Sequence, residues 1–156
     1  MSTPVTVESI ALMGVVTLAG GYQLASFAKR VGKKRYQVKL AYPAITGNPD
    51  FELIYRAQQN CLEFYPIFMS ALWTSGLFFH KYPTFLAGVV YLYSREKYFT
   101  GYSKSAEQRL PGFHWSVRCL MSLLTMGVVG LGHTLLKQYA GINLYEQYLH
   151  QYLNFN

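Results

Sequence analysis

Three polar residues beside a long apolar segment have the types and spacing needed to hold a small charged molecule. Arg56, Asn60 and Glu63 stand four and three positions apart, just before the apolar run from Phe64 to Phe79. On a helix with 3.6 residues per turn, these three side chains project from one face. A charged side chain at membrane depth costs about 2.5–3.5 kcal/mol on insertion scales, so this face is expected to line a bundle interior or a wet cavity.

The two charges of this face need partners. Arg56 and Glu63 are seven positions apart, about 10.5 Å along a helix axis, and this spacing predicts no easy direct ion pair between them. A small zwitterion that carries both signs would satisfy the two side chains together. The alternative is that each pairs with a charge on a neighbouring helix, and on these residues alone that alternative is slightly favoured.

The composition indicates a small membrane protein that crosses the bilayer several times. Hydrophobic residues make up 51% of the 156 residues and charged residues only 13%, about half the charged share of a soluble domain. The net charge of +7 comes largely from short loops beside apolar runs, which indicates membrane topology more simply than nucleic-acid binding. The two cysteines, Cys61 and Cys119, provide neither a disulfide framework nor a metal-ligand pattern, so no metal site is expected.

The apolar runs predict one all-α membrane domain over residues 1–156, built as a four-helix transmembrane bundle. The first run, Ile10 to Phe27, has eighteen residues without a charge, enough to cross roughly 30 Å of hydrocarbon. Its positive charges follow the run rather than precede it, unlike those of a cleaved signal peptide. The transmembrane helices are expected over residues 6–32, 51–80, 84–103 and 113–137.

Local signals refine these elements. Asp50 is the expected N-cap of the second helix, and Pro66 is expected to kink it. If the third helix continues past Gly101, its face carries Arg95, Tyr98, Tyr102 and Arg109 together. Residues 143–156 are expected to form a short amphipathic interfacial helix.

Basic residues predict the orientation of the bundle. They concentrate in the loops after the first and third helices, whereas the loop between the second and third has only Lys81. Both basic loops are therefore expected to face the cytosol. This places a set of polar residues at one membrane face: Arg35, Arg56, Asn60, Glu63, Arg95, Tyr98, Tyr102 and Arg109. Their shared depth favours a binding site in a common hollow over a channel or transporter, which would need polar residues through the full bilayer.

Two longer runs carry a resemblance to a known family. The runs FELIYRAQQNCLEFYP (51–66) and YLYSREKYFTGY (91–102) resemble the signature of the membrane-associated proteins in eicosanoid and glutathione metabolism. The likeness extends over nearly the whole chain except the C-terminal tail. It implies a four-helix transmembrane protomer, assembled as a homotrimer, with glutathione bound between neighbouring protomers near the cytosolic face.

The resemblance also assigns roles position by position. It implies that Arg109 stabilises the glutathione thiolate; Tyr98 is a second catalytic candidate, able to donate a hydrogen bond to the sulfur, although an interfacial aromatic anchor is an equal alternative for it. The residues matched to glutathione binding are Arg35, Arg56, Gln58, Asn60, Glu63, Tyr98 and Tyr102, with Arg35 and Gln58 reaching across a subunit boundary. This chain has Tyr36 and Phe64 where members with leukotriene C4 synthase activity have an arginine and a tyrosine, which leaves the proton donor open and favours a broader transferase.

The charges of glutathione fit these residues. The tripeptide has two carboxylates and one ammonium, which several arginines and one glutamate complement, and an arginine can hold a carboxylate through two parallel hydrogen bonds. A free thiol has a pKa near 8.5, and a nearby arginine in a low-dielectric site lowers it. Arg109 would act electrostatically, because a guanidinium does not serve as a base.

The resemblance therefore implies an integral membrane glutathione transferase of the endoplasmic reticulum or nuclear envelope, with its active site towards the cytosol. It would conjugate glutathione to lipid electrophiles that arrive from the bilayer, with leukotriene C4 synthase-type activity and reduction of lipid hydroperoxides as a side activity. The alternative is a non-catalytic lipid-binding protein, similar to the activator of 5-lipoxygenase. Retention of Arg109 beside the complete set of Arg56, Asn60 and Glu63 argues against that alternative.

Overall fold

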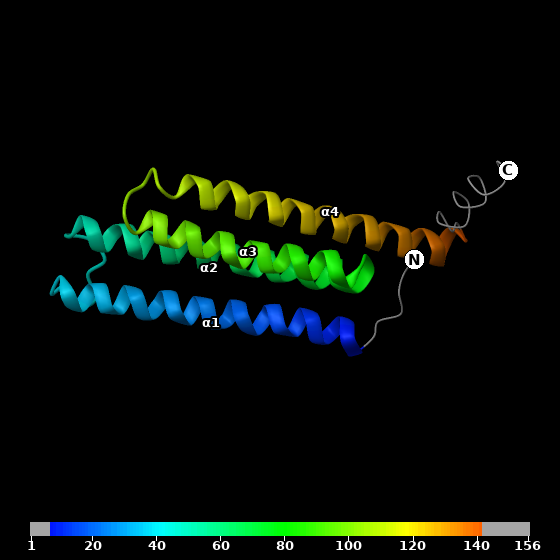
Figure 1. The fold of residues 1–156 in the computed structure, drawn as a ribbon, viewed down its shortest axis with the longest axis horizontal. Coiled ribbons are helices and arrows are strands. Elements are labelled where there is room, and N and C mark those ends of the chain that lie inside the picture. The colour runs from blue at the N-terminus through cyan, green and yellow to red at the C-terminus, as the bar shows by residue number, and fades with distance from the viewer. Residues whose placement is uncertain (1–6, 142–156) are drawn as a thin grey trace.

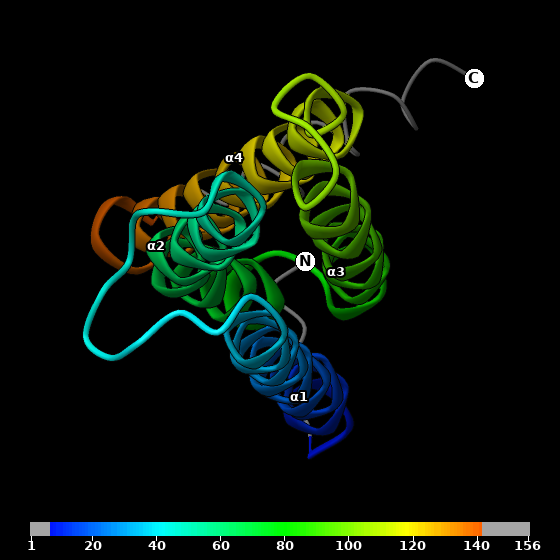
Figure 2. The ribbon, with the colours of Figure 1, turned by 90° about the vertical axis from the view of Figure 1, so that its left-hand side faces the viewer.

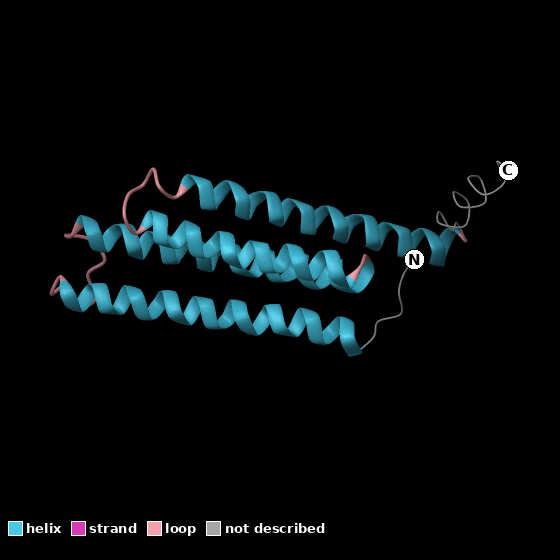
Figure 3. Ribbon diagram, in the orientation of Figure 1, coloured by secondary structure: helices cyan, strands magenta, loops and turns pink. Residues whose placement is uncertain are grey.

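The chain folds into four long helices. The computed structural model describes residues 7–141, and within that range every regular element is a helix: α1 (Val7–Gln37), α2 (Pro49–Phe78), α3 (Lys81–Tyr102) and α4 (Leu110–Ala140) (Figures 1 and 3). The all-α prediction is therefore confirmed. The helix expected over residues 143–156 lies outside the described part of the chain.

Helices α2 and α3 form the centre of the bundle. Viewed end-on, α1 and α4 lie on opposite sides of this central pair, and each of them contacts both α2 and α3 (Figure 2). The α1–α2 and α3–α4 loops lie at the same end of the molecule, and the short α2–α3 connection lies at the other (Figure 1). The two basic loops thus share one end of the bundle, as the alternation of antiparallel helices requires.

The helix ends differ from the expected positions for identifiable reasons. Asn48, rather than Asp50, caps α2, and its side-chain oxygen accepts a hydrogen bond from the Phe51 backbone N–H at 3.1 Å. Proline suits the first helical position because its missing N–H needs no partner there, so Pro49 shifts the cap to the residue before it. At the far end of α1, Lys34 and Arg35 lie in the last turn, where cations interact favourably with the helix dipole, and α1 continues to Gln37.

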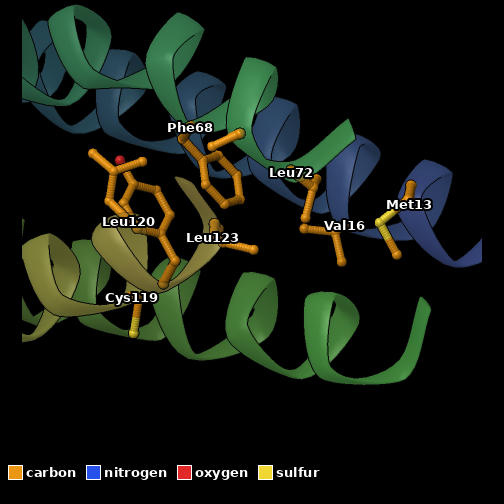
Figure 4. Packing of buried hydrophobic residues seen from close by; sticks show 9 residues of the cluster. Met13, Val16, Phe68, Leu72, Cys119, Leu120 and Leu123 are labelled. Carbon is orange, nitrogen blue, oxygen red and sulfur yellow. The ribbon is translucent and has the colours of Figure 1, made fainter. Parts of the chain in front are cut away.

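Close contacts between helices form the core in the half of the bundle away from the basic loops. Met13 and Val16 of α1 pack with Phe68 and Leu72 of α2 and with Leu123 of α4, and all five are fully buried or nearly so (Figure 4). By length and apolar composition, α1 and α4 qualify as membrane spans among the described helices.

A second core cluster lies under the basic loops and supports the polar face. Phe27 of α1 stacks on Phe99 of α3 with ring centres 4.0 Å apart, and Phe51 and Tyr98 belong to the same buried cluster. This packing holds α1, α2 and α3 together at the depth of the predicted site residues.

Candidate functional site

Arg56 and Glu63 lie on an uncovered face of α2. Their side chains are 63% and 54% exposed, and Arg56 Nη1 is 3.8 Å from Glu63 Oε1. The expectation that this spacing gives no easy direct ion pair is therefore wrong, because both long side chains bend towards each other along the helix. An exposed pair at this distance contributes little to stability, and both charges stay available to a ligand.

Arg56 lines a hollow beside the α1–α2 loop. The hollow has a volume of about 580 Å³, and Thr46, Glu52, Tyr55 and Tyr102 are also among its lining residues. This volume lies within the range of about 300–1,000 Å³ that is typical of ligand pockets. Glu63 and Arg109 do not line it, so this hollow of a single protomer does not unite the predicted charges.

Arg109 reaches the predicted site from a loop rather than from an extended α3. Helix α3 ends at Tyr102, and Arg109 is the N-cap residue of α4. Its guanidinium carbon lies 5.0 Å from the centre of the Tyr102 ring, and its Nη1 donates to the Ala106 carbonyl at 2.6 Å. The expected continuous helical face past Gly101 is thus absent, but the turn of the chain brings Arg109 to Tyr102 nevertheless.

Two glycines allow this turn. A Cβ on Gly101 would collide with the Gln108 carbonyl oxygen, and a Cβ on Gly112 would collide with the backbone nitrogen of Tyr98. The loop therefore folds back against α3, and the start of α4 lies directly on the backbone of Tyr98. In the same loop, hydrogen bonds from its own backbone N–H and from the Ser105 hydroxyl lower the pKa of Glu107, and the Arg109 charge lowers it further.

Tyr98 is buried inside the bundle and does not lie at a lipid interface. Its ring makes an edge contact with Tyr102 at 5.7 Å and a tilted contact with Phe113 at 6.0 Å between ring centres. Tyr98, Tyr102 and Arg109 thus form a chain of contacts at the α3–α4 end, with Tyr98 edge-on to Tyr102 and the Arg109 guanidinium over the Tyr102 ring. The protomer thus brings together three of the residues matched to glutathione chemistry.

Asn60 is bound by Arg95, which was expected at the same membrane face but was not among the residues matched to glutathione binding. The Arg95 guanidinium donates through Nη2 to the Asn60 side-chain oxygen at 2.9 Å, and its carbon lies 4.4 Å from the centre of the Tyr98 ring. Arg95 was placed at the right depth and on the face of Tyr98, but its burial against α2 and α4 depends on helix packing that spacing alone does not reveal.

Arg35 lies apart from these residues in the protomer. Its Nη1 donates to the carbonyls of Ala44 at 2.6 Å and Ala41 at 3.3 Å, and its guanidinium stacks on Tyr42 and Phe51. It lines a separate hollow of about 470 Å³. Within one chain, Arg35 therefore holds the α1–α2 loop against α2.

Gln58, and the two positions that differ from the family pattern, Tyr36 and Phe64, each have a different environment. Gln58 is half-buried on α2. Tyr36 is 86% exposed, and Phe64 packs edge-on against Phe113 at 6.0 Å between ring centres. Across residues 7–141, His, Cys, Asp and Glu side chains nowhere gather in threes as a metal site needs.

Sequence comparisons link this arrangement to known proteins. The sequence pattern of the MAPEG family matches residues 10–129 of this chain. The chain is 40% identical over 141 residues to microsomal glutathione S-transferase 2 of Homo sapiens, covering 90% of this chain and 96% of that protein. It is 43% identical over 124 residues to leukotriene C4 synthase of Bos taurus, covering 80% of this chain and 83% of that protein.

Proposed function

Because this chain belongs to the MAPEG family, we propose that it is an integral membrane glutathione transferase that conjugates glutathione to lipid electrophiles. Its relatives microsomal glutathione S-transferase 2 and leukotriene C4 synthase are enzymes by name. Arg109, together with Arg56, Asn60 and Glu63, favours catalysis over the alternative of a non-catalytic lipid-binding protein.

The observation that carries this proposal is the position of Arg109 over Tyr102, at the edge of a ligand-sized hollow. Tyr102 lines the hollow that also contains Arg56, and the Arg109 guanidinium packs on the same ring. A carboxylate of glutathione held by Arg56 would leave the cysteine of the tripeptide free to reach towards Arg109. The cation would stabilise the thiolate, because an opposite charge at short range favours the ionised form.

The exposed charges on α2 support a site completed between protomers. Arg56 and Glu63 are each more than half exposed in one chain, and charged groups at membrane depth are costly when they face lipid. A neighbouring copy of the chain in a homotrimer would cover this face and enclose glutathione. Arg35 and Gln58 of that copy would add contacts across the boundary, while Glu63 would pair with the glutathione ammonium and Asn60, Tyr98 and Tyr102 would hold the rest of the tripeptide.

The reaction itself needs few protein groups. The thiolate attacks an electrophilic carbon of the lipid, and for an epoxide the new S–C bond forms as the C–O bond breaks. The resulting alkoxide then takes a proton from solvent or from a site hydroxyl. Lipid hydroperoxide reduction would use the same thiolate. We place the protein in the endoplasmic reticulum or nuclear envelope, with both basic loops and the active site on the cytosolic side.

The decisive experiment measures turnover with purified protein in detergent or nanodiscs. We expect saturable glutathione binding, a thiolate absorbance band at neutral pH, and faster conjugation of leukotriene A4 methyl ester than of a generic chlorinated aromatic. Binding of the lipid without any glutathione conjugate would instead support the non-catalytic alternative.

A further inference from the structure

Arg95 is a buried cation at the point where α2, α3 and α4 meet. It is 2% exposed, yet among the described residues no carboxylate lies within ion-pair distance of it. Its guanidinium instead donates to the Asn60 side-chain oxygen at 2.9 Å and reaches the Ser116 hydroxyl at 3.5 Å. Its Nε has no acceptor in the described part of the chain.

Burying a cation without a carboxylate partner between helices carries a large desolvation free energy. The faces of Tyr98 and Phe64, at 4.4 and 5.1 Å from the guanidinium carbon, offset part of the desolvation cost. A methionine of similar length would fill the same space without leaving a charge unpaired, and apolar replacements of buried ionic groups are often at least as stable. The arrangement therefore indicates a role other than stability.

The consequence for Asn60 follows from hydrogen-bond chemistry. A guanidinium only donates, so Asn60 must present its carbonyl oxygen to Arg95, and the two N–H donors of its amide remain for another partner. Asn60 stands between Arg56 and Glu63 along α2. The amide thus offers donors, rather than an acceptor, in the same region as these two charges.

We propose that Arg95 is a positioning residue, which fixes Asn60 as a hydrogen-bond donor towards an acceptor group of glutathione, namely a carboxylate, a peptide carbonyl or the thiolate. This inference rests on the proposed function, because it assumes that glutathione occupies the face of α2. Arg95 acts through Asn60 and does not itself touch the tripeptide.

A double-mutant cycle tests this coupling. The variants are Arg95→Met, Asn60→Ala and their combination, and the readouts are KM for glutathione and the thiolate absorbance. We expect each single variant to raise KM about tenfold, as for a lost hydrogen bond to a charged group, and the double variant to raise it no further than Asn60→Ala alone. Arg118→Met is the matched control, since Arg118 is an exposed arginine on α4, and its KM should stay at the wild-type value.

The results distinguish a failure of the positioning role, a failure of Arg95→Met to fold and a failure of the proposed function. An unchanged KM in Arg95→Met, or a double variant whose effect is the product of the two singles, overturns the positioning role. If Arg95→Met does not fold, Asn60→Asp decides: it keeps a partner for Arg95 but has no amide donors, so a wild-type KM in that variant overturns the inference. A wild-type protein that shows no saturable glutathione binding overturns the proposed function itself, and the inference with it.

Discussion

The Arg109 guanidinium lies over the Tyr102 ring, 5.0 Å from its centre, although a loop separates the two residues. This stacking fixes a cation at the end of α3, beside the hollow that Tyr102 shares with Arg56. Two residues that a continuous helix was expected to align are thus brought together by a reversal of the chain.

Replacing Arg109 with alanine should separate catalysis from binding. Without the cation, the thiol of bound glutathione should titrate near the free value of about 8.5, so the thiolate band at neutral pH should disappear. We expect kcat to fall about a hundredfold, as when one group that stabilises developing charge is removed, while KM for glutathione changes little. A variant at the exposed loop residue Lys104, Lys104→Ala, is the control. An unchanged thiolate band in Arg109→Ala would exclude the assigned role.

Replacing Glu63 with glutamine should weaken glutathione binding. Glutamine keeps the shape of the side chain but removes the charge that would pair with the ammonium, and a charge-assisted hydrogen bond contributes about 1.5–3 kcal/mol. The dissociation constant, measured by titration calorimetry, should therefore rise about tenfold or more.

Glu96 provides the matched control for that measurement. It pairs with Arg30 at 2.6 Å on the exposed surface, so Glu96→Gln removes the same charge away from the proposed site. Its affinity for glutathione should equal that of the wild type. Equal affinities in both variants would reject Glu63 as the partner of the ammonium.

The sequence predicts the helical architecture better than it predicts the contacts of the site. The four helices follow from apolar runs that are long and separated by polar loops, and these signals are local. The direct approach of Arg56 to Glu63 was missed because axial rise ignores how far two flexible side chains can bend. The contact between Arg95 and Asn60 was missed because it depends on how α2 and α3 pack. Likewise, nothing in the spacing indicated that Arg35 would bind carbonyls of its own loop.

Replacing Gly112 with alanine should disturb the site through the backbone. The added Cβ would collide with the Tyr98 nitrogen, so α4 must shift away from α3 and carry Arg109 with it. Overpacking of this kind typically costs 1–3 kcal/mol, and we expect a lower melting temperature together with a reduced kcat.

Gly132 in the same helix is the control for that substitution. A Cβ there would meet nothing within 4 Å, so Gly132→Ala should be neutral or slightly stabilising, because alanine is the better helix former. A Gly112→Ala protein with wild-type melting temperature and activity would show that the close contact between α4 and Tyr98 does not matter for the site.

The last prediction concerns a site shared between subunits. If Arg35 acts across a boundary while Arg109 acts within its own protomer, Arg35→Ala and Arg109→Ala chains should each have very low activity alone but complement each other in mixed trimers. A site is complete where an Arg35→Ala chain supplies Arg109 and its neighbour supplies Arg35, which holds for about one site in three in a cyclic trimer that contains both kinds of chain. Two affinity tags, one on each variant, would isolate the mixed trimers for turnover assays. Mixed trimers with no more activity than the separate variants would place Arg35 in the site of its own chain or outside the site, where its hydrogen bonds to Ala41 and Ala44 serve only the loop.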